Sequence, residues 1–227
     1  MVVHVVDLLP NLLRGAAVTV EVTAAASVLA LALSLPVALA RLSPAWPLRL
    51  LGAAYVEILR GTSALVQLFY LFFILPLFGV RLDPLPTAIV GLGLNFSAYA
   101  SEIVRGAILG VDRGQWEAAS ALHLSRSATL RRIVLPQAVA VMLPSLASLL
   151  IQLLKSTALV SLITLSDLTF AGQALITATG RPFVVWGLVL AFYYVLSLPL
   201  EWAAGRLESH AAACRATAYQ ADPARVV

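Results

Sequence analysis

Long runs of apolar residues with few charges dominate this chain and restrict it to folds that a lipid bilayer can surround. Apolar residues make up 61% of the 227 residues and charged residues only 11%, whereas a soluble domain carries roughly 25% charged residues. A soluble protein of this size could not bury so much hydrocarbon, because its surface-to-volume ratio forces many residues outward. The sequence therefore predicts an all-α integral membrane protein and excludes a soluble enzyme.

Five segments are long and apolar enough to cross a membrane, which takes about 20 residues for a helix. They predict about five transmembrane helices within one domain that covers residues 1–227. The predicted spans are residues 15–40, 62–80, 86–104, 139–165 and 183–204. Between the first two, residues 47–61 carry apolar side chains at helical spacing opposite charged ones. This pattern predicts a helix that lies in the membrane interface.

The basic residues between the spans are distributed unequally. Three arginines, Arg14, Arg81 and Arg181, fall on one side. Eleven fall on the other: Arg41, Arg49, Arg60, Arg105, Arg113, Arg126, Arg131, Arg132, Arg206, Arg215 and Arg225. Because cytoplasmic loops accumulate Lys and Arg, we expect the N-terminus outside and the loop 113–136, between the third and fourth spans, in the cytoplasm. The start of the chain lacks a signal-peptide pattern, so the first span is expected to serve as its own signal.

The residues that carry chemistry in enzymes are scarce here. The chain has no G-x-x-x-x-G-K-[ST] motif, and its only lysine is Lys155 in an apolar run. His4, His123 and His210 are far apart, and no G-x-S-x-G motif is present. A single cysteine, Cys214, excludes an internal disulfide. We therefore predict no catalytic residue, no cofactor and no metal site, and if ATP drives a process here, another chain must hydrolyse it.

The loop 113–136 is polar but amphipathic. Its residues 116–124 predict one short helix, in which Glu117 near the start favours the helix dipole. Ala118 and Ala119 would allow another surface to approach closely. A basic stretch follows, and Leu135-Pro136 opens the next span, where proline is tolerated in the first turn. Such a helix, held between two spans, is suited to docking a cytoplasmic partner.

This loop resembles the signature of ABC-importer permease subunits: E-A-A, three residues, Gly, nine residues, I-x-L-P. Six positions match, and His123 stands where the family has glycine. The resemblance implies that these residues couple the chain to an ATPase: Glu117, Ala118, Ala119, His123, Ile133, Leu135 and Pro136. Since that glycine usually permits a tight turn, the replacement bears on the turn or on its fit to the partner.

The flanking residues resemble one branch, the polar amino-acid uptake permeases of the histidine, arginine and glutamine type. The matching pieces are Glu57-x-x-Arg60-Gly61-Thr62, Ala98-Tyr99-x-x-Glu102-x-x-Arg105-Gly106, Leu135-Pro136-Gln137-Ala138 and Leu154-Lys155-Ser156-Thr157. The chain departs from that branch at Ser63, Ser156 and Ala158. The resemblance implies a multi-pass protein of the bacterial inner membrane. Its partners would be a second permease subunit, identical or related, a cytoplasmic ATPase dimer and an extracytoplasmic solute-binding protein, with no nucleic acid.

Polar residues inside or beside the spans are candidates for a substrate path: Lys155, Ser156, Thr157, Asn95, Tyr99 and Glu21. A charge in hydrocarbon is costly unless it is paired or hydrated, so Lys155 either lines the path or extends to the outer interface. Packing between helices is the alternative for Asn95 and Tyr99. Two acid–arginine pairs, Glu57–Arg60 and Glu102–Arg105, are local pairs at helix ends or brace a gate or the loop.

These observations leave several functions open. The first is the membrane path of an ATP-driven importer for a polar amino acid or a similar zwitterion. A compatible solute such as ectoine is an alternative substrate. A non-ABC membrane scaffold or a membrane-embedded enzyme would use the loop only as a protein contact. A secondary transporter usually has inverted repeats and more spans.

Overall fold

A computed structural model describes the backbone of residues 5–220 and the side chains of residues 8–209. His4, His210, Cys214, Arg215 and Arg225 lie outside the described side chains. The described part of the chain consists of helices and their connections and contains no strand, as the composition predicts.

Four helical stretches are long and apolar enough to span a membrane: Leu8–Arg41, Pro84–Leu109, Arg126–Ile163 and Pro182–Ser209. They correspond to α1 (Val5–Arg41), α4 (Pro84–Leu109), α7 (Leu135–Ser156) with its extensions, and α9 (Pro182–Gln220). A fifth span is complete only if Trp46–Gly61 and Ala64–Phe78, bent by 101° at their junction, count together. The structure thus agrees with the prediction of about five spans.

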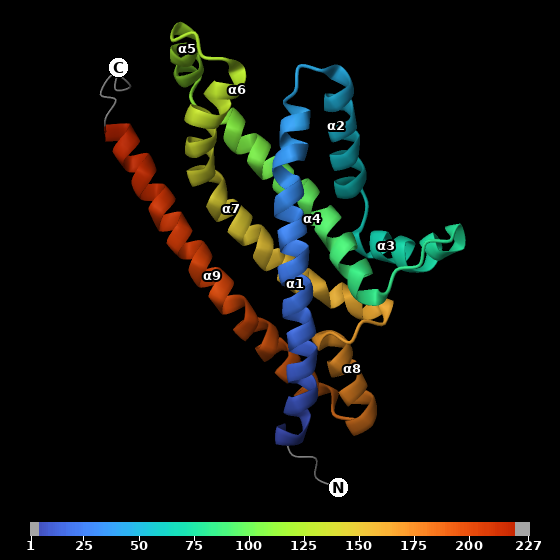
Figure 1. Ribbon diagram of the computed structural model, residues 1–227. Helices are drawn as coiled ribbons and strands as arrows, with labels where there is room; N and C mark the ends of the chain where they lie inside the picture. Colours follow the sequence, from blue (N-terminus) through green and yellow to red (C-terminus); the bar gives the residue numbers. More distant parts are fainter. Residues whose placement is uncertain (1–4, 221–227) are drawn as a thin grey trace.

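The second predicted span is where the structure differs most from the sequence prediction. Helix α2 (Trp46–Gly61) runs alongside α1 instead of lying across its end (Figure 1). After the bend come α3 (Ala64–Phe69), the π-helix η1 (Tyr70–Ile74) and the 3-10 helix η2 (Leu75–Phe78). The stretch predicted as the span 62–80 is therefore not one regular helix, and it is long enough to cross a membrane only together with Trp46–Gly61. The interface position of residues 47–61 stays a prediction.

Side chains of α3 and α4 stabilise the bend between α2 and α3. The carbonyl oxygen of Leu59 accepts hydrogen bonds from Asn95 Nδ2 and Gln67 Nε2, both at 2.9 Å. A backbone carbonyl left without a partner in an apolar interior would cost free energy comparable to a lost hydrogen bond. These tertiary bonds compensate for the break and leave no mark in the hydrophobic periodicity.

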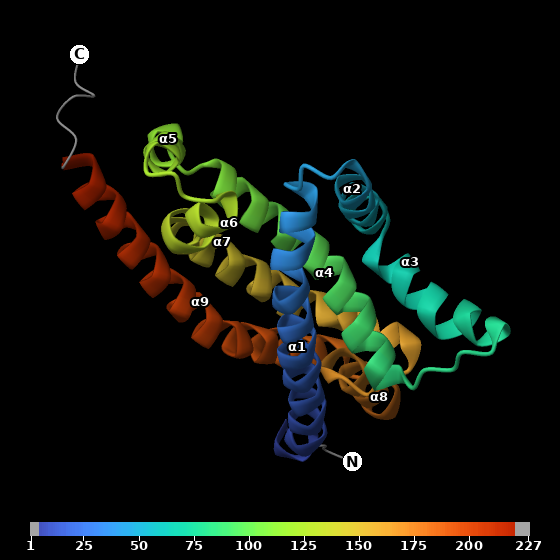
Figure 2. The ribbon, with the colours of Figure 1, turned by 45° about the horizontal axis from the view of Figure 1, so that its top comes forward.

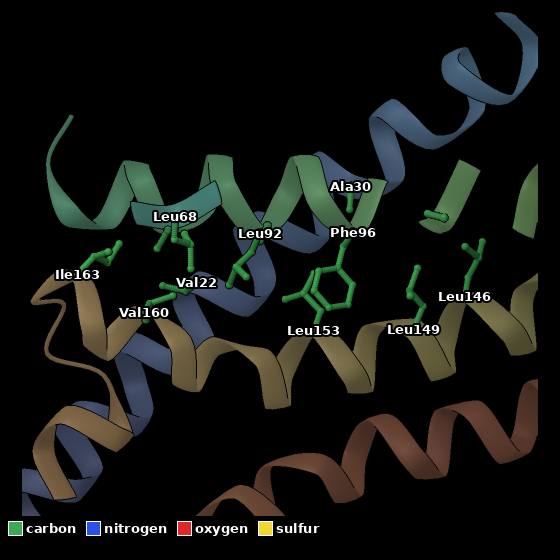
Figure 3. Packing of buried hydrophobic residues seen from close by; sticks show 13 residues of the cluster. Val22, Ala30, Leu68, Leu92, Phe96, Leu146, Leu149, Leu153, Val160 and Ile163 are labelled. Carbon is green, nitrogen blue, oxygen red and sulfur yellow. The ribbon is translucent and has the colours of Figure 1, made fainter. Parts of the chain in front are cut away.

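The core lies where α1 crosses α4 and α7 (Figures 1 and 3). Its central residues include Val22 and Ala30 of α1, Phe96 of α4 and Leu153 of α7. Gly93 brings α1 and α4 close together, because a Cβ there would lie 2.6 Å from Leu29 Cδ2. Small residues at crossing points are typical of helix packing in membranes.

The two ends of the bundle carry different connections. At one end, α5 (Arg113–Ala121), α6 (Arg126–Thr129) and the π-helix η3 (Leu130–Val134) join α4 to α7. At the other end, the 3-10 helix η4 (Thr157–Ile163) and α8 (Leu168–Thr179) join α7 to α9. Figures 1 and 2 show α5 at the end opposite α8 and the start of α1.

Both π-helices have the same local cause. In η1 the N–H of Leu75 donates to Tyr70, and in η3 the N–H of Leu135 donates to Leu130. The next residue is proline in each case, Pro76 and Pro136. Since proline has no N–H, the carbonyl four residues before it loses its α-helical donor, and the turn widens there.

Candidate functional site

The N-terminus of α5 is capped by Asp112. Its Oδ1 accepts a hydrogen bond of 2.7 Å from the N–H of Gly114, and its carbonyl accepts one of 3.1 Å from Gln115. Asp is among the preferred N-cap residues because its carboxylate satisfies an N–H that has no partner in the first turn. The helix therefore begins at Arg113, three residues before the predicted start.

A Schellman motif centred on His123 ends α5. The N–H of His123 donates to Ser120 at 2.9 Å, and the N–H of Leu124 donates to Ala119 at 3.1 Å. His123 has φ of 53°, in the left-handed region where glycine is the usual residue. Histidine is one of the side chains that adopt this region more often than most. The structure thus keeps the turn that the family glycine would make.

The two faces of α5 have different surroundings. Trp116 and Ala119 face inward, where Trp116 packs against a cluster formed by the ends of α1, α4 and α7, and Ala119 is only 1% exposed. The outward face carries residues at the i, i+3, i+4 spacing of one helix side. Its exposed members are Gly114, Glu117, Ala118, Ala121 and Leu122. Ala118 and Ala119, predicted to act together, therefore lie on different faces of the helix, one exposed and one buried.

Helix α5 is fastened to the start of α7. The side chain of Gln137 donates to the carbonyl of Ile133 at 3.0 Å and to Gln115 Oε1 at 3.4 Å. Leu135 packs against the same cluster as Trp116, while Pro136 is exposed at the first turn of α7. Gln137 and Leu135 thus connect α5 and the buried cluster beneath it to the start of α7.

Glu102 collects arginines from three helices. Arg105, on the same helix, makes two hydrogen bonds of 3.0 Å to its carboxylate, and Arg41 of α1 also donates to it. Arg60 of α2 lies 3.8 Å away. These are the three ion pairs among the described side chains, so the predicted local pair Glu57–Arg60 is wrong, because Arg60 extends to α4.

Arg41 is the member of this cluster that sequence analysis missed. Its place at the end of the first span served only to orient the chain. The structure shows that it is largely buried and contacts Gly52 of α2, where a Cβ would lie 2.9 Å from Arg41 Cγ. A charged side chain at a helix end gives no signal in the sequence for the partner that it reaches.

The predicted substrate-path residues do not form one hydrogen-bonded group. Asn95 is buried and donates hydrogen bonds to the carbonyl of Leu59 and to Gln67 Oε1, at 2.9 and 3.2 Å. The ring of Tyr99 lies beneath Arg60, whose Cζ is 5.1 Å from the ring centroid. In the described part of the chain, no hydrogen bond or ion pair joins either residue to Lys155.

The remaining path candidates lie away from α5, toward the α8 end of the bundle. Lys155 is exposed in the last turn of α7, 20 residues after its start, or about 30 Å along a helix that rises 1.5 Å per residue. Ser156 ends α7, and Thr157 is fully buried, with its hydroxyl bonded to Leu154 at 2.6 Å. The α-helix changes to 3-10 helix η4 at this point. Glu21 is exposed on α1.

Asp167 is a buried carboxylate that sequence analysis did not single out. It caps α8 by accepting from the N–H groups of Phe170 and Thr169, at 2.9 and 3.2 Å. The hydroxyl of Tyr193 donates to it at 3.4 Å. Burial raises the pKa of this carboxyl above its ordinary value, while the hydrogen bonds to it lower the pKa in part. An Asp directly before a helix was the available signal for this cap.

The described part of the chain contains no group of three or more His, Cys, Asp or Glu side chains that could hold a metal ion. The site is a short helix with Glu117 at its centre. One face packs on the long helices, and the other face points away from the bundle.

Comparison with known proteins identifies the family of this chain. Residues 30–212 match the family described as binding-protein-dependent transport system inner membrane component. The chain belongs to this family. The matched range includes all of the predicted loop, residues 113–136, and four-fifths of the chain.

The relatives and the structures agree with this assignment. The chain is 43% identical over 209 residues to a probable amino-acid ABC transporter permease protein, y4tF of Sinorhizobium fredii, covering 89% of this chain and 88% of that one. It is 43% identical over 159 residues to the L-cystine transport system permease protein TcyB of Bacillus subtilis, covering 70% and 68%. A crystal structure of an amino acid ABC transporter with histidines has a chain with a TM-score of 0.85, 32% identical, covering 92% of this chain and 99% of that one.

Proposed function

We propose that this protein is the permease subunit of an ATP-driven importer for a polar amino acid. The geometry of α5 carries the proposal: a short helix, capped at both ends, that turns one face to the bundle and the other away from it. Family members are inner-membrane components of transport systems, and the similar proteins are named for amino acids.

The outward face of α5 is the docking surface for an ATP-hydrolysing partner. The small side chains of Ala118 and Ala121 allow the surface of the partner to approach closely. Leu122, 72% exposed, supplies an apolar contact. Glu117 stands among them as a partner for a basic side chain. Because Trp116 and Gln137 tie α5 to the cytoplasmic ends of the spans, movement of the partner would be transmitted as a rigid-body shift.

The other partners follow from the same role. A second permease subunit, identical or related, completes the path, and a solute-binding protein delivers the substrate at the α8 end. This arrangement requires the N-terminus outside and α5 in the cytoplasm, the orientation favoured by eleven arginines against three. The L-cystine permease and the structure with histidines are named for different amino acids. The sequence of the permease alone therefore does not identify which amino acid is transported.

Within the subunit, the polar residues of the spans have two roles. Lys155 and Ser156, at the outer end of α7 where the helix changes to 3-10, are candidates to meet the carboxylate of the solute, with Glu21 and Thr157 near the outer half. Glu102 holds α1, α2 and α4 together through its arginines and braces the inner gate next to α5.

The experiment that tests this function begins with co-purification of the tagged chain and identification of the ATP-binding subunit. The complex is then reconstituted in proteoliposomes with its binding protein and a panel of glutamine, histidine, arginine, cystine and ectoine. We expect one of the amino acids to stimulate ATP hydrolysis. Stimulation by ectoine alone would assign the compatible-solute alternative. A chain that co-purifies with no ATPase, or a complex that no member of the panel stimulates, would contradict the proposal.

Replacement of residues 114–122 by a Gly-Ser linker tests the docking surface itself. The variant should insert into the membrane at the wild-type level yet lose stimulated ATP hydrolysis, because the partner has no helix to bind. Normal stimulation in this variant would exclude α5 as the coupling element while leaving the transport assignment intact.

A further inference from the structure

A groove of about 860 Å³ lies behind α5, on the side away from the docking face. Its walls come from the end of α1, the end of α4 and the α5–η3 connection. The apolar lining residues include Leu39, Leu42, Ile108, Leu109, Trp116, Leu124 and Leu130. The buried cluster that anchors Trp116 borders it through Ile108. The groove is therefore an apolar channel formed by elements that the sequence separates by about 90 residues.

The charged residues that line the groove are both basic. Arg113 and Arg126 line it, and no Asp or Glu does. Neither arginine takes part in the three ion pairs among the described side chains. Ser43, Ser120 and Ser127 add hydroxyl groups to the lining. A ligand that fits this composition has a long apolar part and an anionic group that accepts hydrogen bonds.

The position of the groove along the bundle narrows the choice of ligand. Leu42 directly follows α1, and Leu109 is the last residue of α4. Both helices are long and apolar enough to span a membrane, so a groove formed by their ends is expected near the level where hydrocarbon meets the headgroup layer. Trp116 has the amphipathic ring that is enriched at this level. A free anion or a polar metabolite would gain nothing from contact with the apolar walls, whereas a molecule with a hydrocarbon chain would.

We propose that this groove binds an anionic phospholipid, with an acyl chain along the leucines and the phosphate between Arg113 and Arg126. Basic pockets between transmembrane helices on the cytoplasmic side are known to hold anionic headgroups. The bound lipid would connect α1 to α5 and leave the outward face of α5 free for its partner. This lipid site does not depend on the transport role, so the two assignments can fail separately.

Fluorescence of Trp116, which lines the groove, tests the proposal directly. The full-length variant W46F/W186F/W202F keeps this one tryptophan of the four. It is placed in phosphatidylcholine vesicles that contain increasing fractions of either brominated phosphatidylglycerol or brominated phosphatidylcholine. We expect half-maximal quenching at a mole fraction on the order of tenfold lower for phosphatidylglycerol, because each arginine near the surface favours an anionic lipid.

The arginine pairs provide matched variants. R113Q/R126Q should remove the preference for phosphatidylglycerol. R131Q/R132Q, which removes the same charge from exposed residues of the same loop outside the groove, should retain it. Equal quenching by the two lipids, a preference that survives R113Q/R126Q, or quenching by neither lipid would overturn the proposal. The last outcome would indicate that protein covers the groove.

A second measurement keeps the test valid if the tryptophan variant fails to fold. Native mass spectrometry of the protein with all four tryptophans counts the phosphatidylglycerol molecules that remain bound. R113Q/R126Q should lose one bound lipid relative to wild type and to R131Q/R132Q. Equal counts in all three proteins would contradict the site.

Discussion

Helices α5 and α8 make an instructive pair, because each is a short helix that joins two membrane spans at one end of the bundle. Each has an aspartate at its N-cap, Asp112 and Asp167. Each ends at a residue in the left-handed region, His123 with φ of 53° and Gly180 with φ of 65°. The local sequence rules for starting and stopping a helix are therefore the same at both ends.

The packing around the two helices is opposite. Asp167 is fully buried, Leu168 donates to the hydroxyl of Thr19 at 3.1 Å, and Gly15 lets α8 touch α1. Helix α5 instead turns one whole face away from the bundle and is held mainly through Trp116 and Ala119. Cap residues determine where a helix lies in the chain, while the neighbouring spans determine whether it is clamped or presented to a partner.

The largest effect is expected from Gly15→Ala, which challenges the clamp on α8. A Cβ at Gly15 would lie 2.7 Å from the carbonyl oxygen of Asp167 and 2.9 Å from Leu168 Cα. Because both are backbone atoms, the helices must separate, at a cost of about 1–3 kcal/mol in unfolding free energy. Thermal unfolding in detergent measures this loss. Gly205→Ala, with open space at the Cβ position, is the control, and equal melting of the two variants would refute the close contact.

Removing the two aspartate caps compares the ends directly. Asp167→Ala should cost about 2 kcal/mol, because two N–H groups lose their acceptor at a buried site. Asp112→Ala, at an exposed helix start, should cost about 1 kcal/mol or less. Chemical denaturation of both variants in the same detergent measures the difference. If Asp112→Ala were the more damaging change, α5 would be the clamped helix and the contrast would be reversed.

The buried carboxyl of Asp167 also makes stability depend on pH. Burial raises its pKa above the ordinary value of 3.8, so the folded state keeps the proton at a pH where the unfolded chain has lost it. Stability from this group is full below that ordinary value and is lost as pH rises through the raised pKa. As pH rises from 4 to 7, the stability of wild type should therefore fall relative to that of Asp167→Asn, which has no carboxyl to ionise. Parallel melting curves of the two proteins across this range would show that the carboxyl is solvated.

The smallest effect concerns the left-handed residues that end the helices. Gly180→Ala should destabilise by about 1 kcal/mol, since a side chain is strained at positive φ. His123→Gly should stabilise the protein by a few tenths to about 1 kcal/mol, because it removes the same backbone strain. Melting temperatures of the two variants against wild type give both signs. A destabilised His123→Gly would mean that the imidazole makes contacts that offset its backbone strain.

Much of the site could be predicted from local sequence because its elements are local. The spacing from Glu117 to Pro136 located the loop, and the structure places helix α5 there. Residues 126–134 are also helical and run into α7 without a break. Which face of the helix is outward depends on α1 and α4, so Ala118 and Ala119 could not be distinguished beforehand.

The rest of the structure depends on contacts between distant residues. Two of the three arginines that contact Glu102 come from α1 and α2, and the bend after Gly61 relies on Asn95 of α4. Apolar periodicity is the same on both sides of such a bend. Composition and periodicity therefore predict the number of spans better than the course of any one of them.

Site-directed cross-linking of α5 to the co-purified ATP-binding subunit tests the central claim most directly. Ala118→Cys and Ala119→Cys are introduced separately in a Cys214→Ser background, which removes the native thiol. The account predicts that the cysteine at 118, on the outward face, forms the cross-link, and that the cysteine at 119, 1% exposed as alanine, does not. Absence of a cross-link at 118 in a complex that still couples ATP hydrolysis to solute would contradict the assignment of this face as the docking surface.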